Sequence, residues 1–202
     1  MPTPARKGHA VADRASRRRL GLTALVGLAA DLATKHLAWH YLGPPSGPLE
    51  RGTPHDLVPG WLTLVTSQNR GIVFGLNPAE DFGLGPLAGR ALTVLLTLAT
   101  AAIIFYVFAQ SAPRQKGTHL WCGLVLAGAI GNLVDRIAFG YVRDFLQITK
   151  EVTVGGWTLA WPYVFNLADV YLVIGVLAVA AVYLIKGEDG GAPAATRKPQ
   201  ER

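Results

Sequence analysis

Three aspartates in the second half of the chain stand beside asparagine and arginine within strongly apolar surroundings. They occur in three blocks, Gly128-Ala-Ile-Gly-Asn-Leu-Val-Asp-Arg136, Val142-Arg-Asp-Phe145 and Phe165-Asn-Leu-Ala-Asp169. An ionisable side chain near membrane depth is costly unless it is paired or faces water, so such residues indicate a functional site. Two carboxylates held within about 3 Å share one proton, because they cannot both ionise. One can then deprotonate a water while the other polarises a carbonyl, so peptide hydrolysis needs no serine, cysteine or metal.

The best candidates for this pair are Asp144 and Asp169, because no nearby cation is assigned to both. Asp135 stands beside Arg136, and each of these two could pair elsewhere in a purely structural network. Asp135 is also an alternative first catalytic aspartate, since it lies in the more densely patterned block. We prefer Asp144 because it lies beyond the end of a predicted span, where water can reach it.

Asp31 and Lys35 lie one helical turn apart, so an ion pair that only stabilises a helix bundle is the favoured interpretation.

Other chemistries lack the residues that they need. The five histidines include no His-Glu-x-x-His pattern, and no Gly-x-Ser-x-Gly elbow is present. The single Cys122 rules out a disulfide framework or a cysteine-based metal site within one chain. We therefore expect no metal and no cofactor.

The elements that must position these residues are membrane helices. Half of the 202 residues are apolar, which favours a membrane protein over a soluble one. Four segments approach the roughly 20 residues that cross about 30 Å of hydrocarbon. The predicted fold class is a membrane all-α protein with four transmembrane helices at 20–39, 91–109, 120–139 and 165–185, between polar tails at 1–19 and 186–202.

Lysine and arginine gather in the first 19 residues, in the connection 111–118 and after residue 185. The positive-inside rule then puts both termini in the cytoplasm and leaves 40–90 and 140–164 outside. This topology brings the polar residues of all the blocks to one depth near the outer face. It also explains the net charge of +6 without nucleic acid, since the basic residues are not interleaved with aromatic ones.

The outer segments carry strand signals. Residues 61–66 alternate large apolar residues with threonine, which predicts a short strand, and 69–75 could form a second strand or a glycine-broken turn. Segments 145–149 and 153–161 have strand composition around Gly155-Gly156, which predicts a hairpin. Trp157, Trp161 and Tyr163 suit an interfacial aromatic belt. We therefore expect a small extracytoplasmic β-sheet and loop region.

These motifs resemble those of the lipoprotein signal peptidase family, or signal peptidase II, of bacterial cytoplasmic membranes. The resemblance covers about 20–185 and implies an aspartyl endopeptidase that removes the signal peptide from prolipoproteins, just before a cysteine modified with diacylglycerol. It rests on five blocks in family order: Asp31-Leu-Ala-Thr-Lys35, Asn69-Arg-Gly71, Gly128 to Arg136, Val142-Arg-Asp-Phe145 and Phe165-Asn-Leu-Ala-Asp169.

The resemblance also implies roles for individual residues, with Asp144 and Asp169 as the catalytic dyad. The residues that it implies for substrate binding are Asn69, Gly71, Asn132, Arg136 and Asn166, and those in supporting positions are Asp31, Lys35 and Asp135. We expect a monomer in the bacterial inner membrane, with both termini cytoplasmic and the active site at the outer face. Its partners would be the lipid-modified prolipoprotein and membrane lipids.

Two points stay open. The interval between the two blocks that carry the dyad is longer than the family pattern, with 152–160 as the expected insertion, so the shape of that outer loop is not predicted. A small transporter or channel with aspartates relaying protons or cations is the alternative function. Clustering of the carboxylates at one face disfavours it, because a relay would spread them through the membrane depth.

Overall fold

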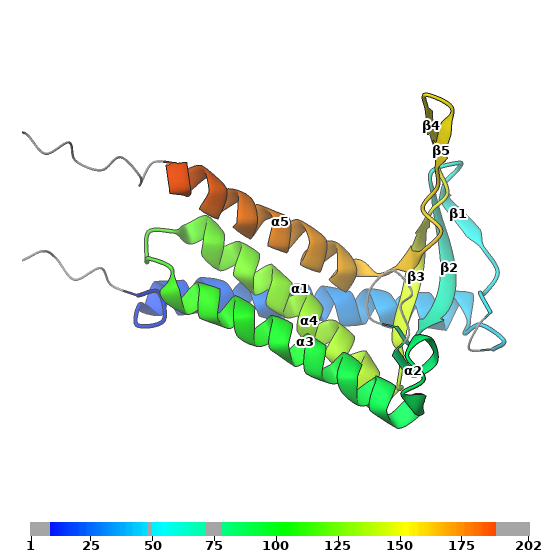
Figure 1. Ribbon diagram of the computed structural model, residues 1–202, viewed down its shortest axis with the longest axis horizontal. Coiled ribbons are helices and arrows are strands. Elements are labelled where there is room, and N and C mark those ends of the chain that lie inside the picture. The colour runs from blue at the N-terminus through cyan, green and yellow to red at the C-terminus, as the bar shows by residue number, and fades with distance from the viewer. Residues whose placement is uncertain (1–8, 48–49, 72–77, 189–202) are drawn as a thin grey trace, which may run out of the picture.

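The computed structural model describes residues 9–47, 50–71 and 78–188. Four long helices form a bundle, and small antiparallel sheets lie across one end of it (Figure 1). The helices are α1 (Arg14–Leu42), the short α2 (Pro78–Asp81), α3 (Gly85–Gln110), α4 (Lys116–Ala138) and α5 (Leu167–Glu188).

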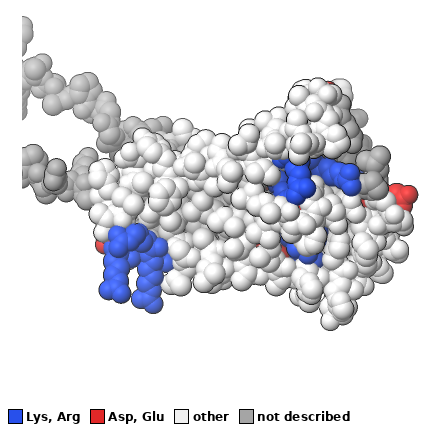
Figure 2. Space-filling model, turned by 90° about the horizontal axis from the view of Figure 1, so that it is seen from below, with Lys and Arg blue, Asp and Glu red and all other residues white. Residues whose placement is uncertain are grey.

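Three helices in the described part of the chain, α3, α4 and α5, are long and apolar enough to cross a membrane. They match three of the four predicted spans. Helix α1 covers the remaining predicted span. It is long enough to cross a membrane, but its polar and charged residues make it less apolar than the other three helices. Figure 2 shows Lys and Arg gathered near the two ends of the molecule on this face, with a largely uncharged surface between them. That distribution fits insertion in a membrane.

Helix α1 begins inside the segment predicted as a polar tail. Asp13 caps it, since one carboxylate oxygen accepts hydrogen bonds from the Ser16 backbone N–H at 2.7 Å and the Ser16 hydroxyl at 2.6 Å. The backbone N–H of Ala10 donates to the carbonyl of Ser111 at 2.8 Å, which fixes the chain before the cap against the connection between α3 and α4. The basic run 17–19 is therefore helical, because arginine is a good helix former and a cap precedes it.

Helix α4 packs against α1, α3 and α5, and glycines allow the closest approaches. A Cβ at Gly123 would lie 2.8 Å from the carbonyl oxygen of Leu20 on α1, and a Cβ at Gly27 would lie 2.8 Å from the Cβ of Ala127. Small residues at such crossings let helix backbones approach closely, which is a common packing mode in membranes. The bundle is thus tight where α4 meets its neighbours.

The main sheet has the strand order β1-β2-β3-β6, and its neighbouring strands are antiparallel. A separate pair, β4 and β5, forms a hairpin whose turn residues Gly155 and Gly156 have φ values of 58° and 85°. Positive φ at both turn positions is the requirement of a type I′ turn, so the predicted hairpin is confirmed. The strands are β1 (His55–Val58), β2 (Leu62–Asn69), β3 (Val142–Ile148), β4 (Val152–Val154), β5 (Trp157–Leu159) and β6 (Val164–Phe165).

The other strand predictions have mixed outcomes. The strand predicted at 61–66 is confirmed within β2, and the one at 145–149 lies largely within β3. Strands β1 and β6 were not predicted, because each is too short to show alternation. Of the segment 69–75, Asn69 ends β2, and residues 72–77 lie outside the described part of the chain.

Candidate active site

The start of α5 is a reciprocal capping motif between Asn166 and Asp169. The side-chain oxygen of Asn166 accepts the backbone N–H of Asp169 at 3.0 Å, and Oδ2 of Asp169 accepts the backbone N–H of Asn166 at 3.1 Å. This pattern satisfies backbone donors that a helix start leaves open, and the carboxylate lies at the positive end of the helix dipole. The local sequence therefore fixes both the first turn of α5 and the position of the Asp169 carboxylate.

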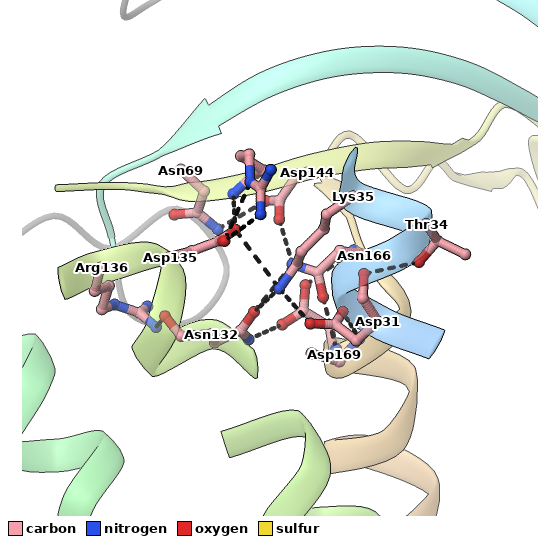
Figure 3. A network of polar contacts seen from close by, with 12 residues as sticks. Asp31, Thr34, Lys35, Asn69, Asn132, Asp135, Arg136, Asp144, Asn166 and Asp169 are labelled. Atoms are coloured by element: carbon pink, nitrogen blue, oxygen red, sulfur yellow. Dashed lines mark hydrogen bonds and ion pairs between the residues drawn. The ribbon is translucent and has the colours of Figure 1, made fainter. Parts of the chain in front are cut away.

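Asp144 faces this helix start from strand β3, where two asparagine side chains hold it (Figure 3). Asn166 Nδ2 donates to Oδ1 of Asp144 at 2.6 Å, and Asn69 Nδ2 donates to Oδ2 at 2.9 Å. No ion pair to a lysine or arginine is found for Asp144 or Asp169 among the residues that the structure describes. Neutral amides thus hold the Asp144 carboxylate, and Asn166 bridges it to Asp169.

The two carboxylates differ in burial. The Asp144 residue is 1% exposed, whereas Asp169 is half-buried. The prediction that water reaches Asp144 directly is therefore wrong. Asp144 does lie beyond the end of α4, but the first four residues of β3 are buried. Asp169 is therefore the more exposed residue of the pair.

Asn132 of α4 connects the carboxylate pair to a buried cation. Its Nδ2 donates to Oδ1 of Asp169 at 2.9 Å, while its Oδ1 accepts from Lys35 Nζ at 2.9 Å and from Asn166 Nδ2 at 3.2 Å. Because an ammonium can only donate, Lys35 determines which end of the Asn132 amide faces α1. The amide N–H₂ is then directed toward Asp169.

Behind Asn132 lies a buried network of charges. Lys35 Nζ lies 2.8 Å from Oδ2 of Asp31 and 3.7 Å from Oδ2 of Asp135. Asp135 also accepts two hydrogen bonds from the guanidinium of Arg143, at 2.8 and 3.1 Å, and one from the Arg143 backbone N–H at 2.9 Å. Asp31 further accepts the backbone N–H of Ala168 at 2.9 Å. Two cations therefore engage Asp135, and the network joins α1, α4, β3 and α5.

A close approach of α1 to α4 supports this network. A Cβ at Gly131 would collide with the Asp31 carboxylate. We therefore expect Gly131→Ala to lower the free energy of unfolding by about 1–3 kcal/mol, since overpacking a tight contact costs that much. Chemical unfolding in detergent measures the change.

The matched control is Gly21→Ala on α1, where no described side chain and no described residue of another element lies within 4 Å of the added Cβ. There the helix propensity of alanine should stabilise the protein by about 0.5–1 kcal/mol. Equal effects of the two substitutions would contradict the packing argument.

Arginines hold the remaining edges of the site. Arg136 donates to the carbonyl of Gly71 at 2.9 Å, and the backbone N–H of Gly71 donates to Oδ1 of Asn69 at 2.9 Å. Arg90 of α3 donates to the carbonyls of Arg136 and Ile137 at 2.7 and 2.9 Å, which satisfies open acceptors at the end of α4. The chain after β2 is thereby tied to the end of α4.

All ten site residues predicted from the sequence thus lie in one connected set of hydrogen bonds and ion pairs. Two arginines in this set were missed, Arg143 and Arg90. Arg143 stands inside a motif block next to Asp144, so its position was a usable signal. Arg90 has no sequence signal, because its role depends on how α3 crosses the end of α4.

Burial raises the pKa of Asp144 well above the ordinary aspartate range, and the negative charge of Asp169 raises it further. Below the ordinary pKa of about 3.9, the carboxyl is protonated in both the folded and the unfolded chain, so its stabilising contribution is fully present. As the pH rises toward the raised pKa of the folded state, the unfolded chain releases its proton first and this contribution is lost.

We therefore expect the free energy of unfolding of the wild type to fall with pH relative to that of Asp144→Asn. The slope should reach at most about 1.4 kcal/mol per pH unit, the value for one proton. Unfolding of both proteins in detergent, from about pH 4 to about pH 8, measures it. A difference that does not change with pH would show that Asp144 titrates normally.

Within the described residues, no group of three or more His, Cys, Asp or Glu side chains is placed to hold a metal ion. What the arrangement offers is two adjacent carboxyl groups, one on a deeply buried residue and one on a half-buried residue, at the end of membrane-length helices. A bundle and a carboxylate pair of this kind define a membrane-bound hydrolase of the aspartic peptidase class.

Comparisons with known proteins identify the family. Residues 23–185 match the family model described as signal peptidase (SPase) II. A lipoprotein signal peptidase of Rhodopseudomonas palustris (strain TIE-1) is 37% identical over 178 residues, covering 87% of this chain and 95% of the relative. One of Chlorobium phaeobacteroides (strain BS1) is 36% identical over 164 residues, covering 80% and 93%. The chain belongs to the signal peptidase II family and is an aspartic peptidase of bacterial membranes.

The fold has solved counterparts as well. A structure titled as a bacterial membrane enzyme, determined by the in meso method at 2.3 Å resolution, aligns with a TM-score of 0.65 at 22% identity. The alignment covers 87% of this chain and 93% of that one. At this level of identity the comparison supports the fold.

Proposed function

We propose that the chain removes signal peptides from lipoproteins, with Asp144 and Asp169 as its catalytic pair. The observation that carries the assignment is the bridge through Asn166, which donates to Oδ1 of Asp144 at 2.6 Å and to Oδ2 of Asp169 at 3.1 Å. The side chain and the backbone N–H of Asn166 thus hold the two carboxylates next to each other. Asp135 is the weaker candidate, because Lys35 and Arg143 already neutralise it.

The unequal surroundings of the pair suggest separate roles. Asp144 is buried and next to a second carboxylate, so it holds a proton in the resting enzyme. Asp169 is half-buried at a helix N-terminus, where a negative charge is favoured and water has access. Asp169 then removes the proton from the attacking water while protonated Asp144 donates to the carbonyl oxygen of the scissile bond. The attack forms a tetrahedral intermediate with two hydroxyl groups on carbon. When its C–N bond breaks, Asp169 gives the proton it took from water to the amine nitrogen, and one hydroxyl returns a proton to Asp144, which restores both carboxyl groups.

The residues implied for substrate binding form the walls of this site. Asn69, Asn132 and Asn166 each donate an amide N–H to one of the carboxylates, so we assign them first to orienting the pair. Arg136 and Gly71 tie the end of β2 to α4, beside the place where a peptide backbone would reach Asp144. Arg136 and Gly71 would affect substrate binding by setting the shape of the site at the end of β2.

We also propose that α1 is a fourth transmembrane helix. It runs beside α4 and ends at the same face of the bundle as the sheets (Figure 1). Its buried Asp31 and Lys35 neutralise each other, which reduces the cost of placing them near the membrane. The basic residues 17–19 and the connection with Arg114 and Lys116 would lie in the cytoplasm, and the sheets and the catalytic pair outside.

Cleavage by the purified chain in liposomes tests the proposed substrate. We expect a diacylglyceryl-modified precursor to be cut just before the modified cysteine, and the same precursor without the lipid to be cut far more slowly. With the catalytic pair at the outer face of the membrane, the acyl chains of the precursor can stay in the outer leaflet while its scissile bond reaches the two carboxylates. Equal rates on both precursors would exclude lipid recognition, and no cleavage of either would overturn the proposed function.

A further inference from the structure

The hairpin of β4 and β5 has one apolar and one polar face. Its register pairs Val152 with Leu159 and Val154 with Trp157, and directly paired residues point to the same side of an antiparallel ladder. These four side chains therefore share a face, which we call the hairpin face. The opposite side carries Thr153 and Thr158, whose hydroxyls lie 3.2 Å apart.

The side chains of the hairpin face are exposed. They are 48% (Val152), 64% (Val154), 80% (Trp157) and 66% (Leu159) exposed. An isolated two-stranded hairpin is marginally stable in water, and a contiguous exposed apolar patch marks a site of interaction. No ladder joins β4 or β5 to the main sheet. The hairpin therefore needs a partner for its apolar side.

The position of the hairpin indicates what that partner is. The sheets lie across one end of the bundle, and the hairpin projects to one side of it, past α5 (Figure 1). A membrane crossed by α3, α4 and α5 would extend sideways from the bundle, which would place lipid beside the hairpin. The segment 152–159 contains no charged residue, and tryptophan is enriched where membranes meet water.

We propose that the hairpin face rests on the membrane leaflet at the sheet end of the bundle, with Trp157 and Leu159 at the boundary between headgroups and acyl chains. The threonine face then points to water. An interfacial element binds in proportion to the apolar area that it buries, so this hairpin acts as a lateral anchor for the sheet that carries Asp144. Because 152–159 carry no charged side chain, the hairpin can approach the lipid without taking a charge out of water.

Adjacent residues on opposite faces provide a matched test. Leu159→Cys and Thr158→Cys are made in the full chain, and each is reconstituted in nanodiscs that hold one copy and no substrate. The native Cys122 is fully buried, so it contributes little background. With a water-soluble maleimide, we expect the thiol at 158 to react about tenfold faster than the thiol at 159, because thiol reactivity follows exposure. Equal rates would overturn the proposal.

A second measurement identifies lipid as the cover. Brominated lipids in the nanodisc should quench tryptophan emission in the wild type more than in Trp157→Phe. Emission of Trp157 that is insensitive to bromine would overturn the proposal, and so would protection of position 159 that appears only after a precursor is added or two copies are present. Those results would assign the face to substrate or to a second chain. Because neither measurement uses cleavage, failure of the proposed activity would be seen separately.

Discussion

Replacing either Asp144 or Asp169 with asparagine is expected to abolish cleavage of a lipid-modified precursor while the protein still folds. General acid and base catalysis each contribute roughly 10²–10⁴-fold, and an amide can neither accept the proton of water nor deliver one. Because the two carboxyl groups act as one unit, the double variant should lose little beyond either single variant. The measurement is the initial rate of precursor cleavage in detergent or liposomes.

The control is Asp56→Asn, an exposed aspartate of β1 whose carboxylate accepts a hydrogen bond from the Thr63 hydroxyl at 3.0 Å. It should cleave at the wild-type rate. Folding of the two inactive variants is checked by thermal unfolding. Normal turnover by either variant would overturn the dyad. Normal turnover by Asp144→Asn, with Asp135→Asn folded but inactive, would transfer the first catalytic role to Asp135.

The second large effect is expected for Lys35→Met. This substitution removes the cation between two buried carboxylates, those of Asp31 and Asp135. Breaking a buried ion pair by removing one partner costs about 3–5 kcal/mol, because an uncompensated charge is left. Activity should fall as well, since Asn132 loses the donor that directs its amide toward Asp169. Unfolding in detergent and precursor cleavage measure the two effects.

The double variant Asp31→Asn/Lys35→Met separates stability from positioning. Removing both charges should restore part of the free energy of unfolding. It should not restore cleavage, because the donor to Oδ1 of Asn132 is still absent. If the double variant cleaves normally, Lys35 acts only on stability, and if Lys35→Met unfolds like the wild type, the network is not stabilising.

The sequence predicted the site better than it predicted the shape around it. Topology predicted that eight of the ten residues reach one depth, because four segments deliver polar residues there, whereas Asn69 and Gly71 were implied only by the family resemblance. The hairpin at Gly155-Gly156 was predictable because the turn chemistry is local. A local signal therefore predicts the structure well where neighbouring residues alone determine the backbone conformation, as they do in this turn.

What could not be predicted depends on contacts between distant segments. Burial of Asp144 depends on Asn69 and Asn166, which come from other elements. The start of α1 within a basic segment depends on a cap at Asp13 and on the contact of Ala10 with Ser111. The role of Arg90 depends on where α3 meets the end of α4. No pattern along the chain encodes these distances.

The capping motif at the start of α5 affects the choice of an inactive variant for structural work. Asp169 is both a proposed catalytic group and half of a helix cap, so a substitution there also weakens the first turn of α5 by about 0.3–1 kcal/mol. Asp144 has no capping role, and asparagine there removes a desolvated carboxyl. A form of the enzyme that captures an uncut precursor is therefore better built at Asp144, where chemistry can be stopped without loosening the helix that the precursor must meet.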